Sequence, residues 1–191
     1  MFTFFKLPQQ KKTSPSPFTT QAEVLEKYNL YLNDNGDPVG MCRPMTNAYL
    51  SLILRGKNPG EYLANDQRFL ELAIKEENKE LESRNPDVDH FAFEENNIPH
   101  LDKTVEKSSL KKETLSKLLE DSQHLLITYP QKKFEHEFYL GKKMDGNCRF
   151  FDANITGGER NGPCDELISN IVEIMKSRYT EENKPFRIGM S

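Results

Sequence analysis

Three side chains of this 191-residue chain have the types required for nucleophilic acyl transfer: a cysteine, a histidine and an aspartate. Cys42 lies in the segment Gly-Met-Cys-Arg-Pro, at the start of a helical pattern. The N-terminus of a helix carries about half a positive charge, which lowers the pKa of a thiol, and its N–H groups can donate to an oxyanion. A thiol nucleophile also needs a base and a group that orients the base. His136 and Asp152 are our candidates for these two roles.

The relation between His136 and Asp152 follows from two predicted strands, 134–141 and 147–152. Side chains alternate along a strand, and each of these two residues shares a face with the more apolar set of its strand. If both apolar faces point into one core, His136 and Asp152 lie on the same side of the hairpin. That parity requires a five-residue loop, 142–146, instead of a two-residue turn at the Asp-Gly pair. It places His136 directly opposite Asp152, within reach of an imidazole–carboxylate hydrogen bond.

The two other cysteines do not fit this chemistry. Cys148 alternates with apolar residues and is expected in the core, and Cys164 has no assigned role. Three sparse cysteines make a disulfide framework improbable and favour a reducing compartment. The chain has no Cys-x-x-Cys motif, and its four histidines include no pair at helical ligand spacing, so a structural zinc site is not expected. With no nucleotide motif either, we expect no cofactor and no metal.

Three patches carry a resemblance to a known family: Gly40-Met41-Cys42, His136-Glu-Phe, and Phe-Phe-Asp152-Ala-Asn154. The chain resembles the YopT/AvrPphB-type papain-like cysteine proteases, which are bacterial effectors. The resemblance covers about residues 35–178. It implies that Cys42 is the nucleophile, that His136 is general base and then acid, and that Asp152 orients the histidine.

The sequence departs from the family pattern in two places. The phrase after the aspartate is usually Pro-Asn, whereas Ala153 precedes Asn154 here. The family also places an amide side chain a few residues before the cysteine, where it donates to the oxyanion. Asp37 lies near that place, and its carboxylate would repel an oxyanion; the nearest amide is Asn35. The oxyanion donor is therefore Asn35, a backbone N–H of Cys42, or missing.

The elements that must position these residues are mostly helices in the first half of the chain and strands in the second, which is typical of an α+β fold. The expected helices are 20–32, a helix after Cys42 with its apolar face at Met45, Ala48, Tyr49, Leu52 and Ile53, then 59–83, 103–121 and 164–178. The expected strands are 124–129, 134–141, 147–152 and a terminal edge strand at 186–190, with polar connections over 84–101 and 154–163.

The resemblance implies a papain-like architecture, with a helical N-terminal part packed on a small antiparallel sheet in the C-terminal half. Residues 1–20 are rich in Pro, Ser and Thr over 6–20 and are interpreted as a flexible leader, and 21–191 as one catalytic domain. The net charge of −4 argues against nucleic acid as a partner. No apolar run approaches the roughly 20 residues that a membrane span requires. No classical signal peptide is visible, because polar residues from Lys6 onward interrupt the apolar start.

The function expected from this pattern is that of a thiol protease. By the resemblance, it is a secreted bacterial effector that acts in the host cytoplasm on a host protein, and we expect a monomer. Two alternatives stay open. The same triad can deamidate or transglutaminate a glutamine side chain, and a degenerate papain-like fold can serve as an inactive protein-binding module. The substrate, the cleavage site and the role of residues 1–20 are not readable from the sequence.

Overall fold

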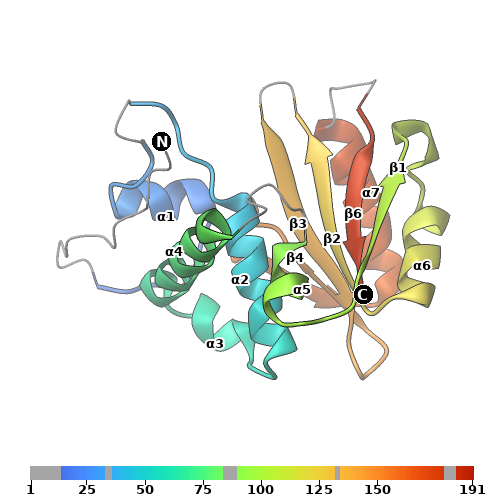
Figure 1. Cartoon of the computed structure of the whole chain (residues 1–191), viewed down its shortest axis with the longest axis horizontal. Helices are drawn as coiled ribbons and strands as arrows, with labels where there is room; N and C mark the ends of the chain where they lie inside the picture. The colour runs from blue at the N-terminus through green and yellow to red at the C-terminus, as the bar shows by residue number, and fades with distance from the viewer. Residues whose placement is uncertain (1–13, 33–35, 84–89, 132–133, 179–183) are drawn as a thin grey trace.

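An antiparallel sheet of six strands, in the order β1-β6-β2-β3-β4-β5, forms the centre of the computed structural model. The structure describes residues 14–32, 36–83, 90–131, 134–178 and 184–191. The strands are β1 (Leu101–Val105), β2 (His124–Pro130), β3 (Glu135–Lys142), β4 (Cys148–Phe151), β5 (Glu159–Gly162) and β6 (Phe186–Met190). The N-terminal helices lie on one side of this sheet, and two later helices lie on the other (Figure 1).

The N-terminal helices precede the sheet in the chain, as the sequence predicts for an α+β fold. They are α1 (Gln21–Lys27), α2 (Cys42–Leu54), α3 (Pro59–Leu63), α4 (Asp66–Glu82) and α5 (Phe91–Glu95). A 3₁₀ turn (Lys107–Ser109) precedes α6 (Lys112–Asp121), and α7 (Cys164–Arg178) lies beside it. Among the described residues, no helix combines the length and the apolar character needed to cross a membrane.

The sheet separates two apolar cores. On the side of α2, Tyr139 and Phe151 pack against the helices, and the rings of Tyr49 and Phe151 stack with centroids 4.5 Å apart. On the side of α6 and α7, the neighbouring strand residues Phe138 and Phe150 face each other with ring centroids 5.4 Å apart. Because successive residues of β3 and β4 point to opposite cores, both strands are apolar on both faces.

Four of the predicted elements are wrong in extent. The helix predicted over 20–32 ends at Lys27, with Tyr28 as its C-cap residue. The single helix predicted over 59–83 is two helices, because the chain breaks before α4 and Asn65 caps it by accepting from the N–H of Arg68 at 2.9 Å. The helix predicted over 103–121 begins only at Lys112, and β1 occupies the start of that range. Of the predicted connection 84–101, residues 84–89 lie outside the described residues, and α5 forms within the rest.

Two predictions about the C-terminal part also need correction. The glycine-rich connection 154–163 contains β5, which pairs with β4. The terminal strand β6 is confirmed as a strand, but it lies between β1 and β2 and is not an edge. The sequence predicts a helix from residue 103, where most of β1 lies, so it predicts no strand on the outer side of β6.

The β3–β4 hairpin has the predicted parity but not the predicted register. Its ladder ends at the pair Lys142–Cys148, which leaves a five-residue loop, 143–147, one residue later than expected. In this register His136 is not directly opposite Asp152, because the position that faces residue 136 is 154, two residues after Asp152. A shift by two residues keeps every side chain on its face, so the apolar pattern could not distinguish the two registers.

Part of the predicted leader is packed onto the domain. In the described residues 14–20, Phe18 is only 2% exposed, and its ring contacts those of Phe69 and Phe151. Its backbone N–H donates to Leu63 O at 2.7 Å, and Thr19 O accepts from the N–H of Gly157 at 2.8 Å. This stretch therefore belongs to the folded domain, while residues 1–13 lie outside the described residues.

The expectation of no disulfide is wrong, because Cys148 and Cys164 are bonded to each other. The bond joins the first residue of β4 to the first residue of α7, and their Cα atoms are 4.7 Å apart. The sequence suggested no such pair because the contact depends on how α7 lies against the sheet. It leaves Cys42 as the free thiol of the chain.

Replacing Gly158 with alanine should destabilise the fold by about 2–4 kcal/mol. Gly158 has a φ of +72°, and a Cβ there would lie 2.6 Å from Cε2 of Phe151. Gly146 is the matched control, since its φ is +82° but a Cβ there would meet nothing within 4 Å. Urea unfolding should give about 1 kcal/mol for Gly146→Ala, from backbone strain alone. Equal losses of unfolding free energy in the two variants would show that the contact with Phe151 is unimportant.

Candidate active site

Helix α2 lies against the part of β3 that extends past β4. The β3–β4 ladder begins at Tyr139, so Glu135 and Glu137 lie beyond it. Side chains of α2 take the place of the missing neighbour: Thr46 Oγ1 donates to Glu137 O at 3.1 Å, and Cys42 Sγ lies 3.8 Å from Glu135 O. The carbonyl of Glu137 is buried, where a backbone oxygen requires such a partner, whereas Glu135 is exposed. The first residue of α2, a cysteine, is thereby held at the end of β3.

The structure brings Cys42, His136 and Asp152 together at this place. His136 Nε2 lies 2.8 Å from Asp152 Oδ1, so the predicted imidazole–carboxylate hydrogen bond is present despite the shifted register. The same oxygen accepts from the backbone N–H of Asn154 at 2.8 Å. Histidine and aspartate are almost completely buried, whereas the cysteine is half-buried. With Nε2 committed to the carboxylate, Nδ1 of His136 is the nitrogen left to take the thiol proton.

The environment of Asp152 favours its ionised form. Burial alone would raise its pKa, but the hydrogen bond and charge of His136 outweigh burial, and the backbone N–H of Asn154 adds to them. Arg178 at the end of α7 lies 4.0 Å from Asp152 Oδ2 and contributes positive charge. The net pKa of this carboxyl is therefore lowered, and at neutral pH it is a carboxylate that can hold a protonated imidazole.

Cys42 and His136 shift each other in opposite directions. Burial would lower the pKa of His136, yet its hydrogen bond to Asp152 and its interaction with Cys42 raise that pKa to about 9. Burial would raise the pKa of Cys42, yet the hydrogen bond and charge of His136 lower it, and backbone hydrogen bonds at Glu137 and Arg43 assist. The pair is thus set up as thiolate and imidazolium, the form in which a cysteine is nucleophilic.

Two donors are placed to stabilise an oxyanion. The first is the N–H of Cys42 in the N-terminal turn of α2, where the N-cap residue Met41 makes no side-chain capping bond. The second is Gln21, an amide that the sequence reasoning missed. The earlier candidate, Asn35, lies outside the described residues.

Gln21 is held by three contacts. Its backbone N–H donates to Ala153 O at 2.7 Å, and its Oε1 accepts from the N–H of Met41 at 2.8 Å. Its Nε2 donates to Asn154 Oδ1 at 2.5 Å, and Asn154 Nδ2 lies 3.2 Å from His136 Nδ1. Because Gln21 is far from Cys42 in the chain, only the packing of α1 against the 153–157 loop reveals it; no spacing rule in the sequence could have found it.

A cleft opens on both sides of Cys42. On one side a pocket of about 350 Å³ is lined by Gln21, His136 and Asn154 and by the apolar side chains of Val39 and Phe134, among others. Phe134 is 63% exposed, so its ring is available to a ligand.

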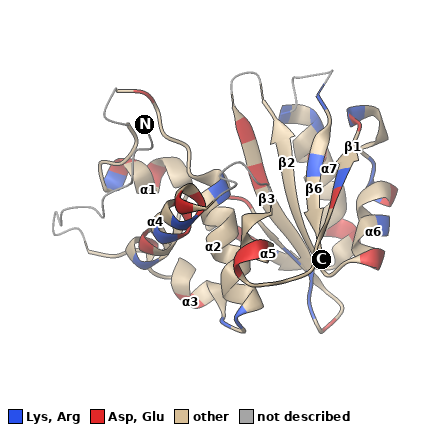
Figure 2. Ribbon diagram, viewed as in Figure 1, with Lys and Arg blue, Asp and Glu red and all other residues tan. Residues whose placement is uncertain are grey.

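The pocket on the other side of Cys42 has about 180 Å³ and a different lining. Glu77 of α4 and Glu135 and Glu137 of β3 contribute carboxylates, and Arg43 also lines the pocket. Both carboxylate oxygens of Glu135 accept from Arg187, at 2.8 and 2.7 Å. Figure 2 shows red segments, which mark Asp and Glu, along α4 and near the start of β3. Glu135 lies between the two pockets and lines both, so the cleft has more apolar side chains on one side of the thiol and more carboxylates on the other.

Comparison with solved structures finds a protein of similar fold, the Pseudomonas avirulence protein AvrPphB. The two structures superpose with a TM-score of 0.55 over 84% of this chain and 93% of that chain, at 15% sequence identity. At this identity the likeness concerns the fold alone, and it shows that the α+β arrangement described above is papain-like. No protein-family model matches the chain, and no curated protein matches it.

The Asp152→Asn variant should slow the alkylation of Cys42 by iodoacetamide about tenfold or more near pH ~6, since each pKa unit changes the thiolate fraction tenfold below the pKa. A neutral amide stabilises imidazolium less, so the pKa of His136 falls and that of Cys42 rises. Mass spectrometry of the labelled protein gives the rate, and Asp145→Asn, in the exposed β3–β4 loop, is the control. A wild-type rate in Asp152→Asn would contradict the role of the carboxylate.

The pH profile of the wild-type protein provides a separate check. The alkylation rate should fall as the pH drops through the lowered pKa of Cys42, because the thiolate is protonated there. It should not fall as the pH rises through about 9, where His136 loses its proton, because the thiolate persists. Any reaction that also needs the imidazolium as a proton donor should decline above that pH.

Proposed function

We propose that this chain is a cysteine protease of the YopT/AvrPphB type that cleaves a host protein. The observation that carries the proposal is the position of His136, which is bonded to Asp152 and interacts with Cys42 at the N-terminus of α2. The likeness to AvrPphB, for which this family is named, supports the proposal at the level of fold. Fold alone does not assign an activity, so the support for proteolysis comes from the residues of the site.

The proposed reaction begins with the thiolate of Cys42 attacking the carbonyl carbon of a peptide bond. The carbonyl oxygen becomes an oxyanion, held by the N–H of Cys42 and by Nε2 of Gln21, which exchanges its bond to Asn154 for one to the oxyanion. His136 then gives its Nδ1 proton to the leaving amine, and a thioester remains on Cys42. Water, deprotonated by the neutral His136, hydrolyses the thioester and restores the thiol pair.

The lining of the cleft suggests what the substrate looks like. An extended peptide across Cys42 would place one side chain against Val39 and Phe134 and another in the pocket of Glu77, Glu135 and Glu137. Carboxylates in a partly enclosed pocket attract a cationic side chain more strongly than they would in water. We therefore propose a substrate with a basic residue on one side of the scissile bond and an apolar residue on the other.

The resemblance to the effector family supports the remaining part of the proposal. We propose that the protein is secreted by a bacterium, acts as a monomer in the host cytoplasm and does not bind nucleic acid. Deamidation or transglutamination of a glutamine, and binding without catalysis, are the outcomes that would replace proteolysis. These alternatives and proteolysis can be distinguished by the products that the protein forms from the same peptide mixture.

The Cys42→Ala variant should produce no new peptide termini when incubated with a peptide library prepared from a digested proteome. The wild-type protein should produce termini enriched in a basic residue near the cut, and mass spectrometry identifies both. Glutamine converted to glutamate or to an amine adduct, without new termini, would replace proteolysis by the other acyl transfers. If the peptides are unchanged and the Cys42 thiol reacts no faster than an ordinary thiol, the protein is an inactive binding module and not an enzyme.

The Gln21→Ala variant should lower kcat about 10²-fold or more while leaving KM nearly unchanged, as expected for loss of an oxyanion donor. Gln21→Glu keeps the oxygen that accepts from Met41 but lacks the N–H donor, so it should be impaired as well. Gln131→Ala removes another amide from the same pocket and should retain kcat. Full activity in Gln21→Glu would show that the residue only positions the loop before α2.

A further inference from the structure

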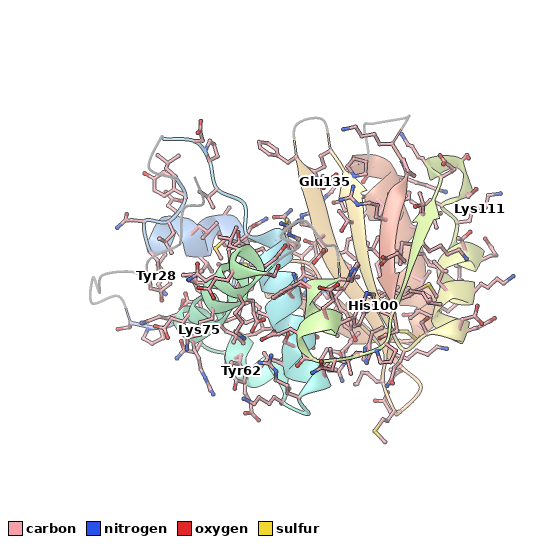
Figure 3. The ribbon with its side chains drawn as sticks, in the orientation of Figure 1. Tyr28, Tyr62, Lys75, His100, Lys111 and Glu135 are labelled. Carbon is pink, nitrogen blue, oxygen red and sulfur yellow. A yellow bond between two sulfur atoms is a disulfide. The ribbon has the colours of Figure 1, made fainter. Side chains whose placement is uncertain are left out.

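A group of metal-ligating side chains lies where α5 meets β1, outside the proposed catalytic cleft. His90 directly precedes α5, and His100 and Asp102 lie at the start of β1. One ring nitrogen of each histidine and one carboxylate oxygen of the aspartate all lie within 4.8 Å of one another. The two imidazole rings are 4.1 Å apart at their centroids. Figure 3 labels His100 beside α5, at the end where β1 begins.

A chain reversal after α5 brings these residues together. Asn97 adopts a φ of 54°, in the left-handed region, and the N–H of Ile98 donates to Phe93 O at 2.9 Å. The chain then returns beside the N-terminus of α5, so that His100 reaches His90. No zinc site is expected from helical histidine spacing or from a Cys-x-x-Cys motif, and this pair depends on the chain reversal instead.

In each ring, the nitrogen that would not bind a metal already has an acceptor: Nε2 in His90 and Nδ1 in His100. His90 Nδ1 lies 2.9 Å from Asp102 Oδ1, and its Nε2 lies 3.2 Å from Glu94 Oε1. His100 Nδ1 lies 3.2 Å from Ile98 O, so when that nitrogen carries the proton, Nε2 is free to bind a metal. A histidine ligand characteristically donates its other N–H to a carboxylate or a backbone carbonyl, which fixes its tautomer and its orientation. Both histidines have this arrangement.

We propose that His90, His100 and Asp102 bind a zinc ion that ties α5 to β1. Two imidazoles and one carboxylate are ligands that zinc takes, with water in the fourth position. The ion would replace the direct hydrogen bond between His90 and Asp102, and Glu94 would then accept from Nε2 of His90. The side chain of His90 is 13% exposed and that of Asp102 is 64% exposed, so the cluster opens to solvent on the aspartate side. That side provides entry for the ion and room for the water.

The proposed ion supports the fold and takes no part in the reaction at Cys42. Helix α5 is attached to α2 by the side chain of Asn47, which accepts from the N–H of Ala92 at 3.1 Å, and by the ion pair of Arg55 with Glu95 at 3.0 Å. A ligand that binds only the folded state stabilises it by mass action. Zinc should therefore raise the melting temperature, because it fixes α5 between α2 and the sheet.

The test uses the full chain with Cys42→Ser, since a thiol beside His136 can itself bind zinc. After dialysis against a chelator, titration calorimetry should show one zinc ion per chain, and zinc should raise the Tm. His100→Gln and Asp102→Asn should each weaken the affinity about tenfold or more and reduce the shift in Tm. Circular dichroism in the presence of chelator establishes that both variants are folded, and either one suffices if the other is not.

Asp165→Asn is the matched control, because it removes an exposed carboxylate from α7, on a different layer of the fold. Its affinity for zinc and its Tm shift should equal those of the Cys42→Ser parent. The proposal is overturned if the parent binds no zinc, or if His100→Gln and Asp102→Asn bind it as tightly as the control does. None of these results depends on whether the protein is a protease.

Discussion

The interaction on which the rest of the site depends is the contact of α2 with the free end of β3. Because β4 stops at Phe151, the β3 carbonyls of Glu135 and Glu137 must find partners elsewhere, and α2 supplies them through Thr46 and Cys42. One end of a helix and one end of a strand are thereby held together. This contact places the thiol of Cys42, at the helix terminus, close to His136 on the strand.

The buried charges at this junction need both layers of the fold. The imidazolium of His136 is hydrogen-bonded to the carboxylate of Asp152, and burying either charge without the other would be costly in free energy. The layer of α2 contributes the thiol, and α7, on the opposite side of the sheet, contributes Arg178. The disulfide between Cys148 and Cys164 holds the start of α7 to β4. The helices on both faces of the sheet thus contribute to the electrostatics of one site.

Hairpin parity, the helix that begins at Cys42 and the last helix, α7, could be predicted from the sequence, because each depends on residues close together in the chain. The α+β class follows from the order of those elements, and the resemblance added the papain-like architecture. The boundaries around α5 and β1 were not predictable in this way, since a polar segment with Pro and Asn fits a loop as well as a short helix. The predicted register of the hairpin was wrong by two residues, because a shift of two residues keeps the same side chains on the apolar faces.

The sequence by itself determined which residue types could form a nucleophile, a base and an orienting group, and that the last two share one side of a hairpin. Only the tertiary structure decided that Gln21 reaches the same cleft, that Cys148 and Cys164 bond, and that His90 and His100 meet. The physical reason is the range of the contacts. Periodicity in a sequence reports which face of a local element is buried, whereas these pairs form where separate elements pack or where the chain reverses.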